Sequence, residues 1–388
     1  MARANALRKG TKGPWYFPGS YWFPIAALYG AIVLPWSVLG QLGWVPAPAG
    51  WQGGLGHAHE MLFGFALAVV AGYALPPGKG RGAALLLLVW LAARGAFALA
   101  PASSAAWALG GLFVAGLAWL IAPTYLRASK WSNRSVAFIV LGLALSAVTF
   151  HALDRARRLQ DMHAITLAAV LLLSMLMFFM GGRILAPAVA GHVRARGAPP
   201  LRHVVQPRLE GTVLWLLAAS IAGVLLAWPL AHRGAGALLL CCVPLGLLRM
   251  GRWRCWLCRD QADLLALLAG YGWLFAGWLL TGLALLTGAP PTYALHAITV
   301  GALGTLTFSV SLRTQMFRAT NDPNRLPWAY AGALLLGAAA LLRITAASAG
   351  QLVAASACWS AAYALLSAVL VWLWWRKHGA APRALPAP

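Results

Sequence analysis

The stretch that decides the fold is Gly56-His57-Ala58-His59-Glu60-Met61-Leu62-Phe63-Gly64-Phe65. It places two histidines and a glutamate at the start of an apolar run that continues to Leu75. Ionisable groups are costly near hydrocarbon and usually mark a functional site. The stretch therefore indicates a membrane helix whose first residues are ionisable groups of a functional site.

The composition of the chain is that of a membrane protein. Of its 388 residues, 61% are hydrophobic and only 10% are charged, whereas a soluble domain carries about 25% charged residues. The net charge of +23 would also suit a nucleic-acid-binding protein, but the basic residues fall in short loops between apolar runs. We therefore expect the lipid bilayer as a partner and no nucleic acid. The sequence identifies no protein partner.

Apolar runs long enough to cross a bilayer recur along the whole chain. A membrane-spanning helix needs about 20 mostly apolar residues, and twelve segments meet this criterion. The sequence thus predicts an all-α polytopic membrane protein with one transmembrane domain over residues 1–388. The predicted helices cover residues 21–41, 57–77, 82–100, 104–125, 135–153, 161–186, 209–231, 234–250, 261–286, 292–313, 327–347 and 351–375.

The basic residues predict the orientation of these helices. If the N-terminus is cytoplasmic, most of the 30 lysines and arginines fall on the cytoplasmic side, as the positive-inside rule requires. The loop between the fifth and sixth helices is an exception, because it carries Arg155, Arg157 and Arg158 on the outer side. The asymmetry predicts an even number of crossings with both termini in the cytoplasm.

In this topology, five of the nine histidines fall at one depth, near the outer ends of four helices. Imidazoles are common ligands of haem iron and copper, so these five are candidate metal ligands. They are His57, His59, His151, His163 and His296. The alternative is that each is a polar group tolerated at a helix end. The remaining four fall in loops or at the terminus and are expected to be dispensable; they are His192, His203, His232 and His378.

Helical geometry separates the two histidines of the opening stretch. His57 shares a face with Glu60 and Gly64, whereas His59 points to nearly the opposite side. A regular helix cannot bring both imidazoles to one metal, so either they serve two centres or the glycine-rich residues 53–56 unwind the first turn. Glu60 is a candidate to orient a ligating imidazole; the alternative is a negative charge favoured by the helix dipole.

Three further features are candidates for a role. Arg183 follows two glycines, which allow close backbone approach, so it is a candidate to bind an anion or a propionate; the alternative is a positive-inside anchor. Arg94 lies inside a predicted membrane helix and needs a partner or a cavity. Cys255 and Cys258 form a single Cys-x-x-Cys pair whose neighbouring arginines would lower a thiol pKa. Redox reactivity and an inert pair both remain open for these cysteines.

Three motifs occur in order along the predicted helices: the stretch from His57 to Phe65, Gly181-Gly182-Arg183-Ile184, and Leu295-His296-Ala297-Ile298-Thr299-Val300-Gly301-Ala302-Leu303-Gly304. Together with the twelve-helix plan, they resemble the NnrS family of bacterial membrane proteins over nearly the whole chain. The resemblance implies a haem- and copper-containing protein of the bacterial inner membrane. It also implies a link to nitric oxide metabolism and to protection from nitrosative stress.

The leading functional prediction is therefore a membrane metalloprotein that binds nitric oxide or a related small species, or handles it by redox chemistry. One alternative is a transporter or a metal- or haem-handling permease, in which the same histidines bind passing cargo. Another is an assembly partner of respiratory enzymes without chemistry of its own. Acidic residues are almost absent from the predicted membrane segments, which argues against a proton- or cation-coupled carrier.

Overall fold

The structure, a computed structural model, describes residues 16–226, 228–320 and 327–378. The two ends of the predicted domain, residues 1–15 and 379–388, lie outside the described residues. The described backbone is helical or irregular and contains no strands. The predicted all-α class is confirmed.

Within these residues the chain makes twelve helical crossings, and two of them are composite. The first composite crossing joins α3 (Gly53–His59), the π-helical segment η3 (Glu60–Ala66) and α4 (Leu67–Ala74); the second joins the π-helical segment η5 (Ala297–Gly304) and α12 (Thr305–Thr320). The other ten are α2 (Gly19–Gln41), α5 (Gly80–Leu99), α6 (Ser104–Leu126), α7 (Trp131–Arg155), α8 (Leu159–Ala195), α9 (Pro207–Leu225), α10 (Pro229–Arg252), α11 (Ala262–Thr287), α13 (Trp328–Ile344) and α14 (Ala349–His378). Ten of the described crossings are long and apolar enough to span a membrane. The predicted count of twelve is confirmed.

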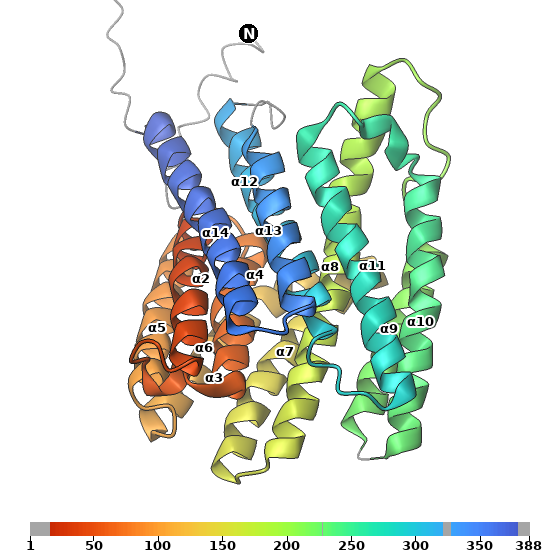
Figure 1. Ribbon diagram of the computed structural model, residues 1–388. Coiled ribbons are helices and arrows are strands. Elements are labelled where there is room, and N and C mark those ends of the chain that lie inside the picture. The colour runs from red at the N-terminus through yellow and green to blue at the C-terminus, as the bar shows by residue number, and fades with distance from the viewer. Residues whose placement is uncertain (1–15, 227, 321–326, 379–388) are drawn as a thin grey trace, which may run out of the picture.

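The crossings form one bundle whose first and last described helices lie side by side (Figure 1). The indole Nε1 of Trp359 on α14 donates to the carbonyl of Gly30 on α2 at 3.1 Å. Because the number of crossings is even, α2 begins and α14 ends at the same end of the bundle (Figure 1). We call the opposite end, where α2 ends and α3, α8 and α10 begin, the histidine end.

Several helix boundaries differ from the predicted ones by more than a turn, among them the ends of α8 and α9 and the start of α10. Helix α8 continues to Ala195, nine residues beyond the predicted end, because hydropathy locates the apolar part of a helix and not its polar extension. Helix α9 ends at Leu225, and α10 begins at Pro229, since proline is favoured in the first turn of a helix. His232, predicted to lie in a loop, is therefore in the first turn of α10.

The two π-helical segments follow directly after His59 and His296. A π-helical turn widens a helix and is frequent at functional sites. Each segment holds a glycine against a large side chain: a Cβ on Gly301 would lie 2.6 Å from the ring of Trp273, and one on Gly64 would lie 3.2 Å from the side chain of Arg94. Small residues here allow neighbouring helices to approach closely.

Candidate functional site

The carboxylate of Glu60 is the centre of a buried polar network. Its side chain is fully buried, and it accepts hydrogen bonds from the hydroxyl of Tyr29 on α2 and from Nη1 of Arg94 on α5, the latter at 2.5 Å. Nδ1 of His59 lies 2.9 Å from the same carboxylate. A buried charge is tolerated when it is paired and hydrogen-bonded. Glu60 is thus the partner that Arg94 required, and it joins three crossings.

The same carboxylate orients the imidazole of His59. Because Glu60 is paired with Arg94, it accepts the proton of His59 Nδ1, and the lone pair of His59 is left on Nε2. This Nε2 lies 3.2 Å from Nε2 of His151 on α7. The ring of Phe97 stacks on His59 with 3.7 Å between centroids. His59 and His151 therefore form a rigid buried pair whose Nε2 atoms face each other.

Glu60 serves His59 and not His57, with which helical geometry had grouped it. Tyr29 and Arg94 hold the carboxylate on the side of His59, and the long glutamate side chain follows its charged partner. His57 lies apart from this network and lines a cavity instead. The structure therefore agrees with the alternative in which His57 and His59 do not share a site. His59 belongs to the network around Glu60, and His57 belongs to the cavity wall.

A cavity of about 400 Å³ opens among the crossings at the histidine end. We call it the histidine cavity, because four imidazoles and one guanidinium contribute to its wall. These residues are His57, His163, His232, His296 and Arg343. Its described lining contains no aspartate or glutamate. Its volume lies in the range of about 300–1,000 Å³ that is usual for small-molecule and cofactor sites.

Two of these imidazoles have their tautomer set by the backbone. Nδ1 of His163 lies 2.8 Å from the carbonyl of Leu159, and Nδ1 of His296 lies 2.7 Å from the carbonyl of Thr292. A carbonyl only accepts, so Nδ1 carries the proton in each ring and Nε2 keeps the lone pair. A backbone carbonyl bonded to one ring nitrogen is the usual support of a histidine that ligates a metal through the other.

Three polar atoms of the cavity wall are buried without a hydrogen-bond partner among the described residues. They are Nδ1 of His57, Nε2 of His232 and Nη1 of Arg343. The guanidinium of Arg343 lies over the ring of Tyr293, 5.3 Å from its centroid. Buried polar groups nearly always have partners, so orphaned ones in a cavity point to a bound group. An unpaired arginine suits an anionic group.

The structure thus gathers all five candidate histidines at one end of the bundle, in two sets. His57, His163 and His296 line the cavity, and His59 pairs with His151. The sequence prediction missed two contributors. His232 had been assigned to a loop because the seventh predicted helix, residues 209–231, ran past the true end of α9 at Leu225. Arg343 was not among the candidate residues, although a basic residue inside a predicted membrane segment was an available signal.

Arg183 lies away from both sets of histidines. It is exposed, its guanidinium carbon lies 5.6 Å from the ring centroid of Phe179, and it does not line the histidine cavity. The two glycines before it have another use. A Cβ on Gly182 would collide with the guanidinium of Arg249, and one on Gly181 would collide with the hydroxyl of Tyr271. The glycines make room for side chains of two neighbouring helices.

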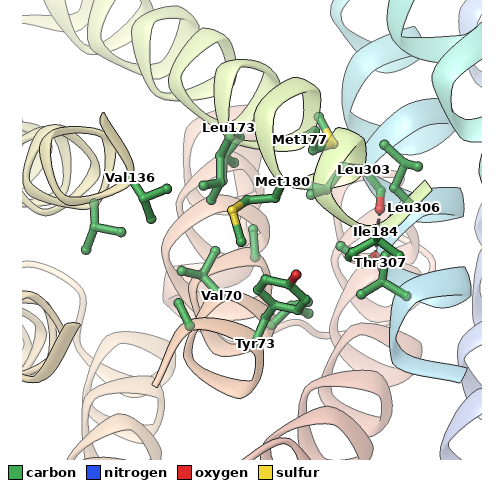
Figure 2. Close-up of a pocket in the computed structure, with 17 residues that line it drawn as sticks. Val70, Tyr73, Val136, Leu173, Met177, Met180, Ile184, Leu303, Leu306 and Thr307 are labelled. Atoms are coloured by element: carbon green, nitrogen blue, oxygen red, sulfur yellow. Dashed lines mark hydrogen bonds between the residues drawn. The ribbon is translucent and has the colours of Figure 1, made fainter. Parts of the chain in front are cut away.

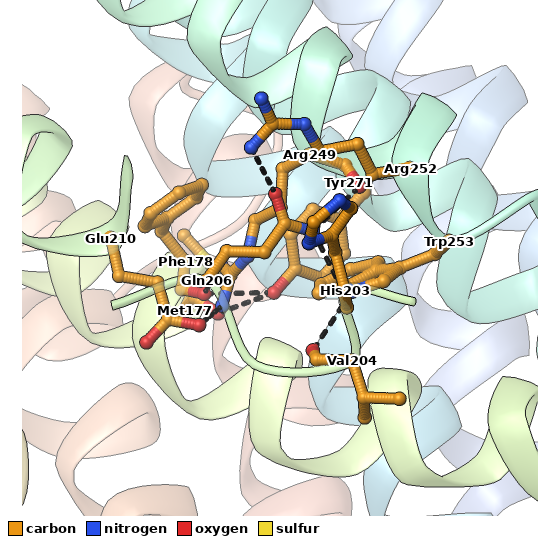
Figure 3. Close-up of polar contacts among 10 residues, drawn as sticks. All are labelled: Met177, Phe178, His203, Val204, Gln206, Glu210, Arg249, Arg252, Trp253 and Tyr271. Atoms are coloured by element: carbon orange, nitrogen blue, oxygen red, sulfur yellow. Dashed lines mark hydrogen bonds and ion pairs between the residues drawn. The ribbon is translucent and has the colours of Figure 1, made fainter. Parts of the chain in front are cut away.

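Arg249 and Tyr271 belong to a second buried network, shown in Figure 3. Nη2 of Arg249 lies 2.5 Å from Oε1 of Glu210, and Nη1 donates to the carbonyl of Phe178 at 2.9 Å. The hydroxyl of Tyr271 donates to the same carbonyl at 2.9 Å. The network joins α8, α9, α10 and α11, and both terminal nitrogens of Arg249 have partners within the protein, whereas its Nε has none among the described residues. We interpret it as a structural clamp on these four helices.

The Cys-x-x-Cys pair lies in a short 3₁₀ turn, Cys255–Cys258, between α10 and α11. Both cysteines are free and buried. Burial raises the pKa of Cys255 to about 12 and also raises the pKa of Cys258 above its ordinary value. The expectation that nearby arginines would lower these pKa values is therefore wrong, because desolvation of the thiolate outweighs their charge.

In the described part of the chain, no three histidine, cysteine, aspartate or glutamate side chains are grouped closely enough to hold one metal ion. The family model described as NnrS protein matches residues 20–377. Among curated proteins and among solved structures, none matches the chain.

Proposed function

The chain belongs to the NnrS family, and from this membership and the histidines at one end of its bundle we propose that it is a haem- and copper-containing protein of the bacterial inner membrane. Its proposed role is in nitric oxide metabolism or in protection from nitrosative stress. Both termini are proposed to be cytoplasmic, so the histidine end faces the periplasm. The observation that carries the proposal is the histidine cavity, with its imidazoles and its unpaired arginine.

The residues of the cavity fit a haem. His163 and His296 each present an Nε2 lone pair, since a backbone carbonyl holds the proton on Nδ1. His57 has a buried ring nitrogen without a partner. Arg343 has a buried, unpaired nitrogen that suits a propionate. We propose that the iron ligand is among these histidines and that Arg343, instead of Arg183, binds the anionic edge.

The residues fit copper less fully. His59 and His151 offer two nitrogens 3.2 Å apart, and both can reach one ion because metal–imidazole bonds measure about 2 Å. The described chain adds no third side chain of the usual kinds to this pair. We therefore propose the pair as the place of the copper, with ligation completed by a group that is not one of these side chains.

The chain's own residues do three things in this proposal. Glu60 keeps the proton of His59 on Nδ1 and leaves Nε2 available. Phe97 and Phe150 pack against the His59 ring and hold it in place. The imidazoles and Arg343 give the histidine cavity a basic lining without acids. A haem bound there would supply an iron that binds small diatomic ligands.

The experiment is the visible spectrum, together with the haem and metal content per folded protein, of the purified chain, three test variants and one control variant. We expect a Soret band that shifts on reduction. His296→Ala and His163→Ala should lower the haem content, and His59→Ala should lower the copper content. His203→Ala is the matched control, because His203 is exposed and outside the histidine cavity. A colourless, metal-free protein would favour a permease or an assembly partner, and unchanged contents in all variants would refute the proposed ligands.

A further inference from the structure

A second, smaller cavity lies between α4, α7, α8 and the crossing of η5 and α12, and its wall is almost entirely hydrocarbon (Figure 2). We call it the apolar chamber. Its volume is about 90 Å³, and no charged residue is among its described lining. Two lining side chains carry hydroxyls, Tyr73 and Thr307. The hydroxyl of Thr307 is engaged, since it bonds to the carbonyl of Leu303 at 2.6 Å and to the hydroxyl of Tyr363 at 2.5 Å.

The volume of the chamber and the polarity of its lining determine which molecules can bind in it. About 10–15 Å³ of such volume holds one water-sized molecule, so the chamber has room for a few small molecules. Water needs two to four polar partners, and apolar cavities stay dry and take apolar guests such as xenon. The polarizable thioethers of Met177 and Met180 contribute to the wall (Figure 2). The chamber thus favours a small uncharged molecule over water or an ion.

The chamber continues the histidine cavity deeper into the bundle. Three crossings line both spaces with successive parts of their length. On α8, Val170 lines the histidine cavity and Leu173 lines the chamber. On the crossing that contains η3, Leu62 lines the first and Ala66 the second. On η5, Leu303 lines both. The side chain of Leu303 is therefore shared by the walls of the two spaces.

We propose that the apolar chamber is a binding site for a small, uncharged, apolar molecule, the substrate class of the histidine cavity beside it. The assignment to a substrate rests on the proposed function. A membrane interior concentrates apolar solutes, and a chamber next to the cavity holds such a molecule close to Leu303. Charged or strongly hydrated species are excluded, because the wall offers them no partners.

The test uses xenon as the probe, on the full chain, by diffraction from pressurised crystals. We expect a xenon atom in the apolar chamber. Val70→Phe on α4 and Val136→Phe on α7 fill it from two different helices and should remove that atom. Leu141→Phe is the control, because Leu141 lies on the same helix as Val136 but is exposed and does not line the chamber. A chamber without xenon in the unsubstituted protein would overturn the proposal, whether or not the variants fold.

A second measurement tests the link to the histidine cavity. In haem-loaded protein, both filling variants should bind carbon monoxide several-fold more slowly than the Leu141→Phe control. An unchanged rate would overturn the assignment of the chamber to the substrate. If the purified protein contains no haem, the proposed function and the substrate assignment fail together, while xenon still decides whether the chamber is a binding site.

Discussion

The ion pair between Glu60 and Arg94 gives the sharpest test of the structure. Glu60→Gln keeps the shape of the side chain but removes its charge, and it leaves the guanidinium of Arg94 unpaired at 5% exposure. Removing one partner of a buried ion pair costs about 3–5 kcal/mol, because the other charge stays buried. That cost corresponds to a change of roughly 10²–10⁴ in the unfolding equilibrium. Arg94→Met should cost a similar amount, since it leaves the carboxylate without its counter-charge.

The double substitution separates pairing from burial. With both charges removed, no unpaired charge remains, so the total cost should be smaller than the sum of the single costs by about 0.5–3 kcal/mol. The assay is reversible unfolding in detergent micelles, followed by the fluorescence of the 20 tryptophans. Costs that add without coupling would refute the pairing of Glu60 with Arg94.

An exposed ion pair of the same length serves as the control. Nε of Arg158 lies 2.5 Å from Asp161, but the two side chains are 64% and 38% exposed. Exposed pairs contribute about 0–1 kcal/mol, so Asp161→Asn should have little effect on unfolding. A large effect of Asp161→Asn would mean that the assay does not report burial, and the reasoning about Glu60 would fail with it.

Three further predictions follow from other parts of the chain. A periplasmic reporter phosphatase fused to the C-terminus should be inactive, because the positive-inside rule places that end in the cytoplasm; an active fusion would refute the orientation. The thiols of Cys255 and Cys258 should be alkylated much more slowly at pH 8 in the folded than in the unfolded protein, because burial raises the pKa of each thiol above its ordinary value and keeps it protonated; equal rates would contradict their burial. Gly182→Ala should displace the guanidinium of Arg249 and lower stability by about 3–5 kcal/mol, whereas Gly191→Ala on the same helix has open space and should be neutral or mildly stabilising; equal effects would refute the clamp.

Much of the fold was predictable from the sequence, because a bilayer imposes a length and a composition on each crossing. The same rule placed the five histidines near one edge of the membrane, and the structure has them at one end of the bundle. The error at His232 came from the limits of hydropathy. Hydropathy averaged over a window stays apolar across the short turn between α9 and α10, so it does not detect the turn. Only the proline at position 229 indicates that a new helix begins there.

The partners of the buried charges were not predictable. Tyr29 and Arg94 lie 31 and 34 residues from Glu60 along the chain, and no periodicity links positions on three separate helices. The sequence established only that Arg94 needed a partner. The pKa of Cys255 was misjudged for a related reason, since neighbouring arginines are visible in the sequence but burial is not.

The network around Glu60 also bears on how the chain enters the membrane during synthesis. Residues 53–74 form the least hydrophobic of the ten described spans that are long enough to cross, and they carry a carboxylate that would cost about 2.5–3.5 kcal/mol at the centre of a lone helix. Its hydrogen-bond donors come from the adjacent crossings: the neutral hydroxyl of Tyr29 from α2 before it, and the neutralising guanidinium of Arg94 from α5 after it. We therefore expect the first three crossings to enter the bilayer together. The second crossing, residues 53–74, should stay next to the translocon until α5 has been synthesised and can pair with it.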